Sequence, residues 1–321
     1  TMDGTDVADR LMHFSSEIHR RLKPEHRNKH LGILIYGYQM EMPQGAKPHD
    51  HHAGMICNFP PRYDHSRPWN DPTSPWNVDF HRLVKGWGGI LKQLGYYDYY
   101  GHYYYFGPFG VIHKLREDLP AFRELGGTFL MLENEPVFAA QGVNLYISAQ
   151  LAWDVDADVD ALFEDYCARY YGPAAGPMRR FWLAAERHFA LERPGTRTET
   201  RVAARPEFWS ELDDHLRNAE SIASKLPPEQ KRFADRVAFR RAGFDYGRLA
   251  FECQTMSEHA KDAGGPAGMM QRFEEIAPRL KAIRAKFGES SPYWPPFLPS
   301  WSWLDVDATL SELGKSVTGN Q

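Results

Sequence analysis

Apolar positions in the first half of the chain alternate between helical spacing and short continuous runs. Apolar residues from Val7 to Leu22 recur every three or four positions, which predicts a helix that ends before Pro24. The run LGILIYGY at Leu31–Tyr38 is apolar, β-branched and aromatic, as is typical of a buried strand. The weaker run GMICNF at Gly54–Phe59 predicts a second strand after a loop rich in Pro, Gly and His.

The alternation continues to about residue 132. Helical spacing across Val78–Leu94 predicts a helix with Gly95 as its C-cap, and Tyr96–Tyr100 then predicts a third strand. A further helix is expected at Val111–Leu125 and a fourth strand at Thr128–Leu132.

Helical spacing dominates the rest of the chain, and no strand is indicated beyond Pro177. The segment after residue 290, which contains SPYWPPFLPSWSW, is apolar but irregular. The expected helices are Asn144–Trp153, Asp156–Tyr171, Phe208–Leu226, Arg232–Ala260 and Met269–Phe287.

Alternating helices and strands indicate an α/β fold with parallel strands joined by right-handed crossovers. About four parallel strands could form a small open sheet, or the C-terminal half of a (β/α)8 barrel whose first half is encoded upstream of Thr1. We divide the chain into a (β/α) portion at 1–190 and an α-helical bundle domain at 191–321. In either sheet, the site is expected where strands end and long loops follow.

Charge and composition narrow the classes of function. The chain has 321 residues with 38 basic and 42 acidic side chains, so a phosphate-binding nucleic-acid surface is not expected. Its apolar stretches are too short for a membrane span. The three cysteines form neither a disulfide framework nor a C-x-x-C pair. No signal-peptide pattern opens the chain, and its acidic start resembles an internal point of a longer protein.

Acidic and aromatic residues gather at the predicted strand ends. Glu133 and Glu135 follow the fourth strand, where alternation turns both to one side, as expected for a general acid, a base or a hydroxyl-binding group. Asp98, Tyr100 and His102 alternate in the same way at the end of the third strand. Aromatic rings cover the apolar faces of sugars, while Asp, Glu and Tyr bond their hydroxyls. The alternative is that the tyrosines fill the space between sheet and helices.

Three further strand-end residues, Tyr36, Tyr38 and Asn58, are candidates for substrate binding. The loop KPHDHHAG holds His49–His52, but adjacent histidines point in different directions, so we predict no metal site there. No phosphate-binding glycine loop and no G-x-S-x-G elbow is present, and no cofactor is expected.

The segment Tyr146–Met178 (YISAQLAWDVDADVDALFEDYCARYYGPAAGPM) closely resembles a signature of the domain-of-unknown-function 4838 group, which includes glycoside hydrolase family 163. Weaker likeness lies in the LGILIYGY strand, in Trp87–Tyr100 and in Phe129–Glu133, and Val155 replaces a frequent proline. The likeness covers roughly residues 5–190.

The resemblance implies a hexosaminidase-like (β/α)8 barrel that cleaves N-acetylglucosamine linkages with the acetamido oxygen of the substrate as nucleophile. It also implies bacterial-type glycan degradation in a secreted or periplasmic protein. The proton donor of such barrels follows the fourth strand, upstream of this chain, so an upstream half-barrel segment is an expected partner. We predict a glycosidase with Glu133 and Asp98 as catalytic candidates. The alternatives are a non-catalytic carbohydrate-binding domain and a structural helical domain.

Overall fold

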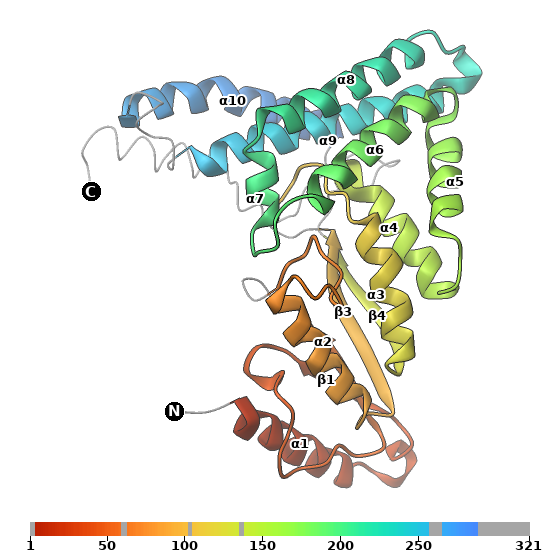
Figure 1. Ribbon diagram of the computed structural model, residues 1–321, viewed down its shortest axis with the longest axis vertical. Helices are drawn as coiled ribbons and strands as arrows, with labels where there is room; N and C mark the ends of the chain where they lie inside the picture. The colour runs from red at the N-terminus through yellow and green to blue at the C-terminus, as the bar shows by residue number, and fades with distance from the viewer. Residues whose placement is uncertain (1–3, 59–62, 102–104, 135–137, 257–264, 288–321) are drawn as a thin grey trace.

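The computed structural model describes residues 4–58, 63–101, 105–134, 138–256 and 265–287, and Figure 1 traces them from the N-terminal sheet region to the helices beyond it. A four-stranded sheet is formed by β1 (Leu31–Ile35), β2 (His52–Cys57), β3 (Gln93–Gly101) and β4 (Gly127–Asn134). The spatial order is β1-β2-β3-β4, and all three pairings are parallel. The prediction of four parallel strands is therefore confirmed.

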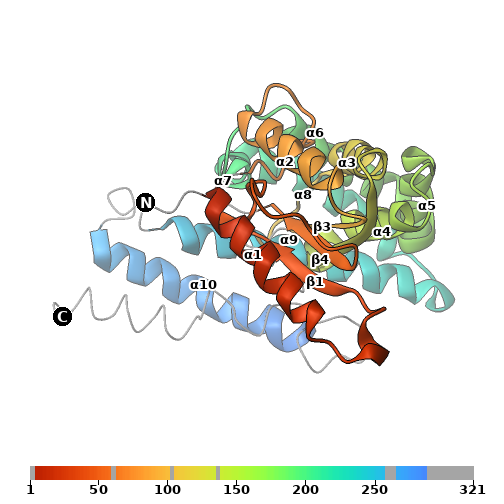
Figure 2. The same ribbon diagram turned by 90° about the horizontal axis from the view of Figure 1, so that it is seen from below.

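A helix precedes β1, and helices connect β2 to β3 and β3 to β4, whereas a loop with one short 3-10 turn connects β1 to β2. Helix α1 (Gly4–Arg20) precedes β1 and lies beside it (Figure 2). Helix α2 (Pro75–Gly88) joins β2 to β3, and α3 (Ile112–Glu124) joins β3 to β4. Short 3-10 turns at Pro24–His26 (η1) and Gly37–Gln39 (η2) flank β1. The carboxyl ends of the strands therefore lie at one edge of the sheet, as parallel pairing requires.

Helix α2 is shorter than its apolar spacing predicts. It ends at Gly88 with Gly89 as the C-cap, and Gly95 lies inside β3, so the predicted cap at Gly95 is wrong. A Cβ atom on Gly88 would lie 2.1 Å from the carbonyl oxygen of Leu125. This close approach of backbones allows the chain to turn at Gly88 and enter the sheet several residues earlier than predicted.

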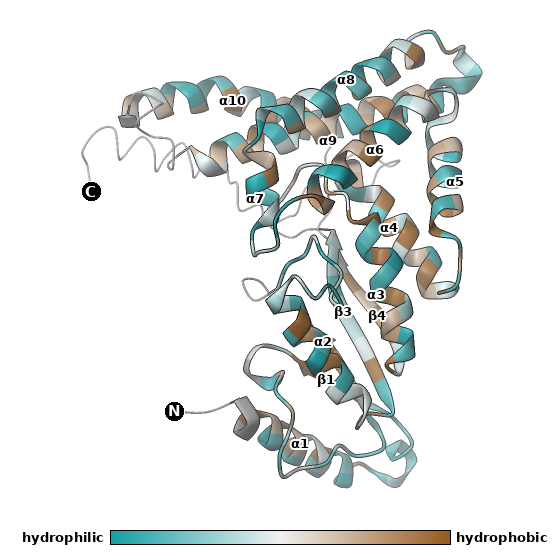
Figure 3. Ribbon diagram, viewed as in Figure 1, coloured by the Kyte–Doolittle hydropathy of each residue, from teal (hydrophilic) through white to brown (hydrophobic). Residues whose placement is uncertain are grey.

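Helices alone follow the sheet in the described part of the chain, as predicted. Helix α4 begins six residues before its predicted start because it is apolar on nearly all sides and lacks a helical period. Helices α6 and α7 were not predicted. Figure 3 shows the mixed apolar and polar faces of the later helices. The bounds are α4 (Phe138–Trp153), α5 (Val159–Tyr171), η3 (Gly172–Ala174), α6 (Ala175–Ala190), α7 (Thr198–Ala203), α8 (Pro206–Ala223), η4 (Pro228–Gln230), α9 (Lys231–Thr255) and α10 (Gly265–Phe287).

The two faces of the sheet differ in how well they are covered. Ile35, Ile56 and Tyr96 are fully buried in one core with side chains of α2 and α3. On the other face, Phe129 and Met131 are 37% and 47% exposed. The ring of Phe129 covers Gly95 of the neighbouring strand, which identifies this as the face opposite Tyr96. We call it the open face.

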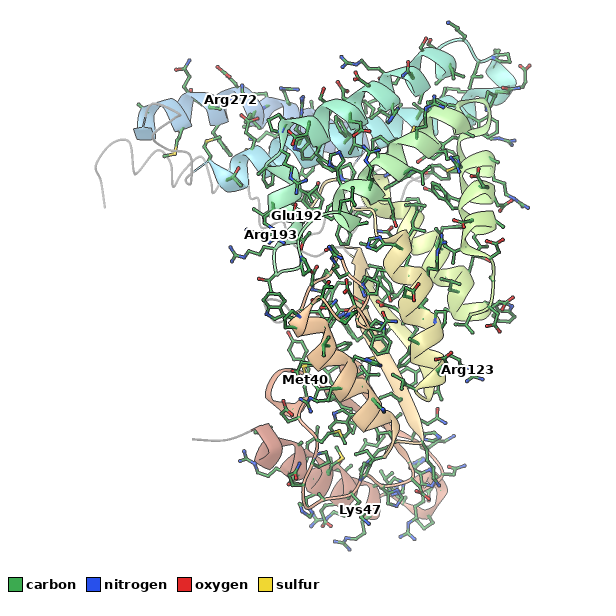
Figure 4. The ribbon with its side chains drawn as sticks, viewed as in Figure 1. Met40, Lys47, Arg123, Glu192, Arg193 and Arg272 are labelled. Carbon is green, nitrogen blue, oxygen red and sulfur yellow. The ribbon has the colours of Figure 1, made fainter. Side chains whose placement is uncertain are left out.

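Polar contacts join the sheet region to the helical region. Asp64, between β2 and α2, accepts hydrogen bonds from the backbone N–H of Gly195 at 2.8 Å and from Oγ1 of Thr198 at 3.2 Å. The backbone carbonyl of Glu192, labelled in Figure 4, accepts a hydrogen bond from Nη2 of Arg67 in the same loop, and the buried Glu192 side chain pairs with Arg201 at 3.2 Å and with Arg205. These buried bonds fix the loop after β2 against the start of the helical region.

Candidate functional site

A cluster of ionisable side chains is buried behind the carboxyl ends of β2 and β3. Asp98 lies on β3, whereas Lys114 and Asp118 lie one turn apart on α3. The Nζ atom of Lys114 is 3.2 Å from Oδ2 of Asp98, and it forms a closer ion pair with Asp118. All three side chains are essentially inaccessible to solvent. Burial of charge is costly, so this arrangement requires its mutual pairing.

Aromatic hydroxyls complete the cluster. Lys114 donates to the hydroxyl of Tyr63 at 2.8 Å, and its Nζ lies 5.1 Å from the ring centroids of Tyr63 and Tyr100. The Tyr96 hydroxyl donates to Asp98 and accepts a hydrogen bond of 2.9 Å from Nδ2 of Asn58. The ammonium group of Lys114 is therefore held by two carboxylates, the Tyr63 hydroxyl and two ring faces.

The two carboxyl groups of this cluster titrate differently. Burial raises the pKa of Asp118 to about 7, and the nearby Asp98 contributes to this rise against the opposing effect of Lys114. Burial would also raise the pKa of Asp98, but Lys114, His65 and hydrogen bonds from Tyr96 outweigh it and lower that pKa. Asp98 is therefore the more acidic of the two carboxyl groups that share Lys114, while Asp118 can hold a proton near neutral pH.

Tyrosines form a second layer on the open face at the same strand ends. Tyr97 and Tyr99 alternate with Asp98 along β3, and their ring centroids are 5.4 Å apart. The Tyr99 hydroxyl lies 3.8 Å from Sγ of Cys57 on β2. Tyr36 follows β1 in an extended conformation and lies close enough to Tyr99 to contribute to its raised pKa, although burial is the main cause. Each of these three rings is half-buried.

The structure separates the predicted site residues into groups. Asn58, Asp98 and Tyr100 meet in the buried cluster, on the side of the sheet that the helices cover. Tyr36 lies instead with the tyrosines of the open face. The roles assigned to these residues remain predictions.

The remaining candidate residues lie partly or wholly outside the described structure. Glu133 is the penultimate residue of β4, and Tyr38 lies in η2, but the side chains of both are outside the described structure. His102 and Glu135 are themselves outside the described residues.

The sequence patterns did not identify several residues of the buried cluster and of the tyrosine layer on the open face. Lys114 and Asp118 are four residues apart on one helix, a spacing that places them on the same face and that the sequence HKLRED already contains. Tyr97 and Tyr99 flank Asp98 in the same strand. The alternation that places Asp98 on one face therefore places these two tyrosines on the opposite face. Tyr63 had no signal, because it lies in a loop rich in Pro and Asp.

Five histidines gather near the amino-terminal edge of the sheet. The ring centroid of His19 on α1 lies 4.2 Å from that of His49 and 5.0 Å from that of His51, which stacks on it. His30 and His52 lie within 5.6 and 6.0 Å of members of this group. In the described part of the chain, no three His, Cys, Asp or Glu side chains are arranged to hold a metal ion.

The fold and the site define a parallel α/β protein with aromatic and acidic residues at the carboxyl ends of its strands. The chain belongs to the family named Domain of unknown function (DUF4838), whose model matches residues 1–184, more than half of its length. A search of curated proteins finds no match. No helix in the described ranges is both long and apolar enough to cross a membrane.

Proposed function

We propose that this chain is part of a glycoside hydrolase of the (β/α)8-barrel type, and that it binds a glycan at the carboxyl ends of β1–β4. The observation that carries the proposal is the layer of tyrosines on the open face, formed by Tyr36, Tyr97 and Tyr99. Half-buried rings at strand ends can cover the apolar faces of sugar rings, and their hydroxyls can bond sugar hydroxyls.

The sheet itself supports a barrel. Parallel sheets are usually covered on both faces, yet Leu34, Phe129 and Met131 on the open face are 37–47% exposed. Four further strands from an upstream segment would pair with β1 and β4, close the sheet and bury these side chains. In that arrangement residues 1–190 are the barrel portion, and the helical domain follows from residue 191.

Glu133 is the acidic residue that we assign to the glycan. It lies at the end of β4, the strand next to the tyrosines of β3, which is the edge where parallel α/β enzymes place their catalytic groups. We favour hydroxyl binding as its role, with proton donation as the alternative. Asp98 acts from behind the sheet as a positioning residue, because Lys114 and Tyr96 occupy its carboxylate.

A non-catalytic carbohydrate-binding domain is the second candidate function. The burial of Asp98 favours it, since most glycosidases need two carboxyl groups beside the scissile bond and Asp98 is not accessible to a sugar. The N-acetylglucosamine linkages of N-glycans remain the proposed substrate class for the enzyme, and the same glycans are the proposed ligands of the binding domain.

One experiment separates the two functions. N-glycans and aryl N-acetylhexosaminides are tested for binding and for turnover with the unchanged chain, Glu133→Gln and Glu117→Gln, the last being an exposed control on α3. Loss of turnover by about 10²–10⁴-fold with little change in KM indicates that Glu133 is the acid. Weaker binding by about tenfold or more indicates hydroxyl binding. If Glu133→Gln changes neither quantity, the site is placed wrongly.

A further inference from the structure

A cavity lies among α4, α5 and α9. It encloses about 330 Å³, which is close to the lower limit for small-ligand pockets and suits a single sugar unit. Helices α4 and α5 are neighbours that converge at the loop between them in Figure 1, and α9 packs against both. We call it the helical pocket; its walls include Tyr146, Tyr166, Tyr170, Asp165, Arg169 and Arg236.

Aromatic rings form the walls of the helical pocket. The rings of Tyr166 and Tyr170 stack nearly in parallel with centroids 5.3 Å apart, and Tyr146 lies 5.3 Å from Tyr166 at a tilt. Tyr146 and Tyr170 are half-buried, so part of each lies at the cavity. Such rings suit a flat apolar face such as one side of a pyranose.

The charge of the helical pocket is positive. Two guanidinium groups, from Arg169 and Arg236, line it together with the single carboxylate of Asp165. That carboxylate already accepts bonds from Nε of Arg169 at 2.5 Å and from the Tyr146 hydroxyl at 3.0 Å. A ligand with an anionic group is therefore favoured over a neutral one.

The guanidinium group of Arg236 is oriented before any ligand arrives. Arg236 donates through Nη1 to the carbonyl oxygens of Arg169 and Tyr170 at 2.9 and 3.0 Å, and it stacks on the Tyr170 ring at 4.6 Å. The bond from Arg169 to Asp165 uses Nε, so its two Nη groups lie outside this contact, on a side chain that is 80% exposed. A fixed donor such as Arg236 lowers the entropic cost of binding a carboxylate, and the Nη groups of Arg169 are free of the Asp165 contact to join it.

We propose that the helical pocket binds an acidic sugar, with the pyranose ring on the tyrosines and the carboxylate on Arg169 and Arg236. The inference rests on the proposed function, because it assigns a carboxylate-bearing sugar unit to a glycan-binding protein. It adds a second subsite, formed wholly by helices, that selects glycans by charge.

The test compares two sugars that differ only at C6, methyl β-D-glucuronide and methyl β-D-glucoside, by calorimetry or saturation-transfer NMR at low salt. The glucuronide should bind at least about tenfold more tightly than the glucoside, and Arg169→Met should abolish that preference. Raising the salt concentration should weaken glucuronide binding, since the pocket is partly open to solvent.

Arg217→Met is the matched control. Arg217 is also exposed and also pairs with an aspartate four residues earlier, Asp213, at 3.0 Å, but it lies on α8 outside the pocket. This variant should keep the preference. Equal binding of both sugars, no binding of either, or an unchanged preference in Arg169→Met would overturn the proposal.

Failure here is distinguishable from failure of the proposed function. If the strand-end site is correct and the helical pocket is not, Glu133→Gln alters glycan binding or turnover while no glucuronide preference is found. If only the strand-end site is wrong, the glucuronide preference depends on Arg169 and is unaffected by Glu133→Gln.

Discussion

Replacing Lys114 by methionine should destabilise the protein strongly and in a pH-dependent way. The change keeps an unbranched side chain in a buried site but removes the cation shared by Asp98 and Asp118, together with its bond to Tyr63. Breaking a buried ion pair from one side typically costs about 3–5 kcal/mol, because the remaining charge is left uncompensated.

Protonation of Asp98 gives a second value for the loss in free energy of unfolding. Without Lys114, the folded state can avoid a buried charge by protonating Asp98, whose ordinary pKa is 3.8. Protonating such a carboxyl group costs about 4.4 kcal/mol at pH 7 and about 1.6 kcal/mol at pH 5. In the variant, the folded-state pKa of Asp98 is raised above its unfolded value, so stability is lost as pH rises. The deficit should therefore shrink by about 3 kcal/mol between pH 7 and pH 5.

The assay is denaturant unfolding of the unchanged chain and Lys114→Met at both pH values, with Lys92→Met as control. Lys92 is 65% exposed and pairs with Asp50 at 2.7 Å, and a surface pair contributes only about 0–1 kcal/mol. Adding Asp98→Asn to Lys114→Met should remove most of the pH dependence, since asparagine does not ionise. A deficit below about 1 kcal/mol at pH 7, or one that is equal at both pH values, would refute the reasoning.

Three other predictions concern stability. Burial is the main cause that lowers the pKa values of His51 and His52, and repulsion from neighbouring histidines adds to it, while a hydrogen bond with Ser15 partly opposes it at His52. The free energy of unfolding should therefore fall as pH drops below 6.5, and His52→Gln should reduce that slope in a pH series. Gly243→Ala should lower the free energy of unfolding by about 1–3 kcal/mol, because its Cβ would lie 2.7 Å from the α4 backbone. Gly176→Ala should be neutral or stabilising in the same denaturation assay, because the nearest atom to its Cβ would be 3.9 Å away. Trp153→Ser should change the free energy of unfolding by no more than about 0.5 kcal/mol, because Trp153 is 93% exposed; a larger loss would contradict that exposure.

Sequence patterns predicted the sheet well because its strands are short apolar runs between strong breakers. The end of α2 was missed because it depends on the contact between Gly88 and Leu125, which are 37 residues apart in the chain. Periodicity along one segment carries no information about such tertiary contacts.

The candidate site was predicted less completely for a related reason. Alternation correctly placed Asp98 and Tyr100 on one side of β3, but it did not indicate which side the helices would cover. That depends on Lys114, whose pairing with Asp98 is visible only when α3 is packed on the sheet. The buried cluster is therefore a tertiary feature, whereas the acidic and aromatic character of the strand ends is a property of the sequence.

The open face also has a consequence for handling the protein. Strands β1 and β4 are the edges of the described sheet, and the backbone groups of an uncovered edge can pair with other chains. With Leu34 of β1 and Met131 of β4 exposed on the open face, the described region alone should aggregate as its concentration rises. A lysine at position 131 would oppose such pairing by charge repulsion, so Met131→Lys should keep the described region in solution at higher concentrations.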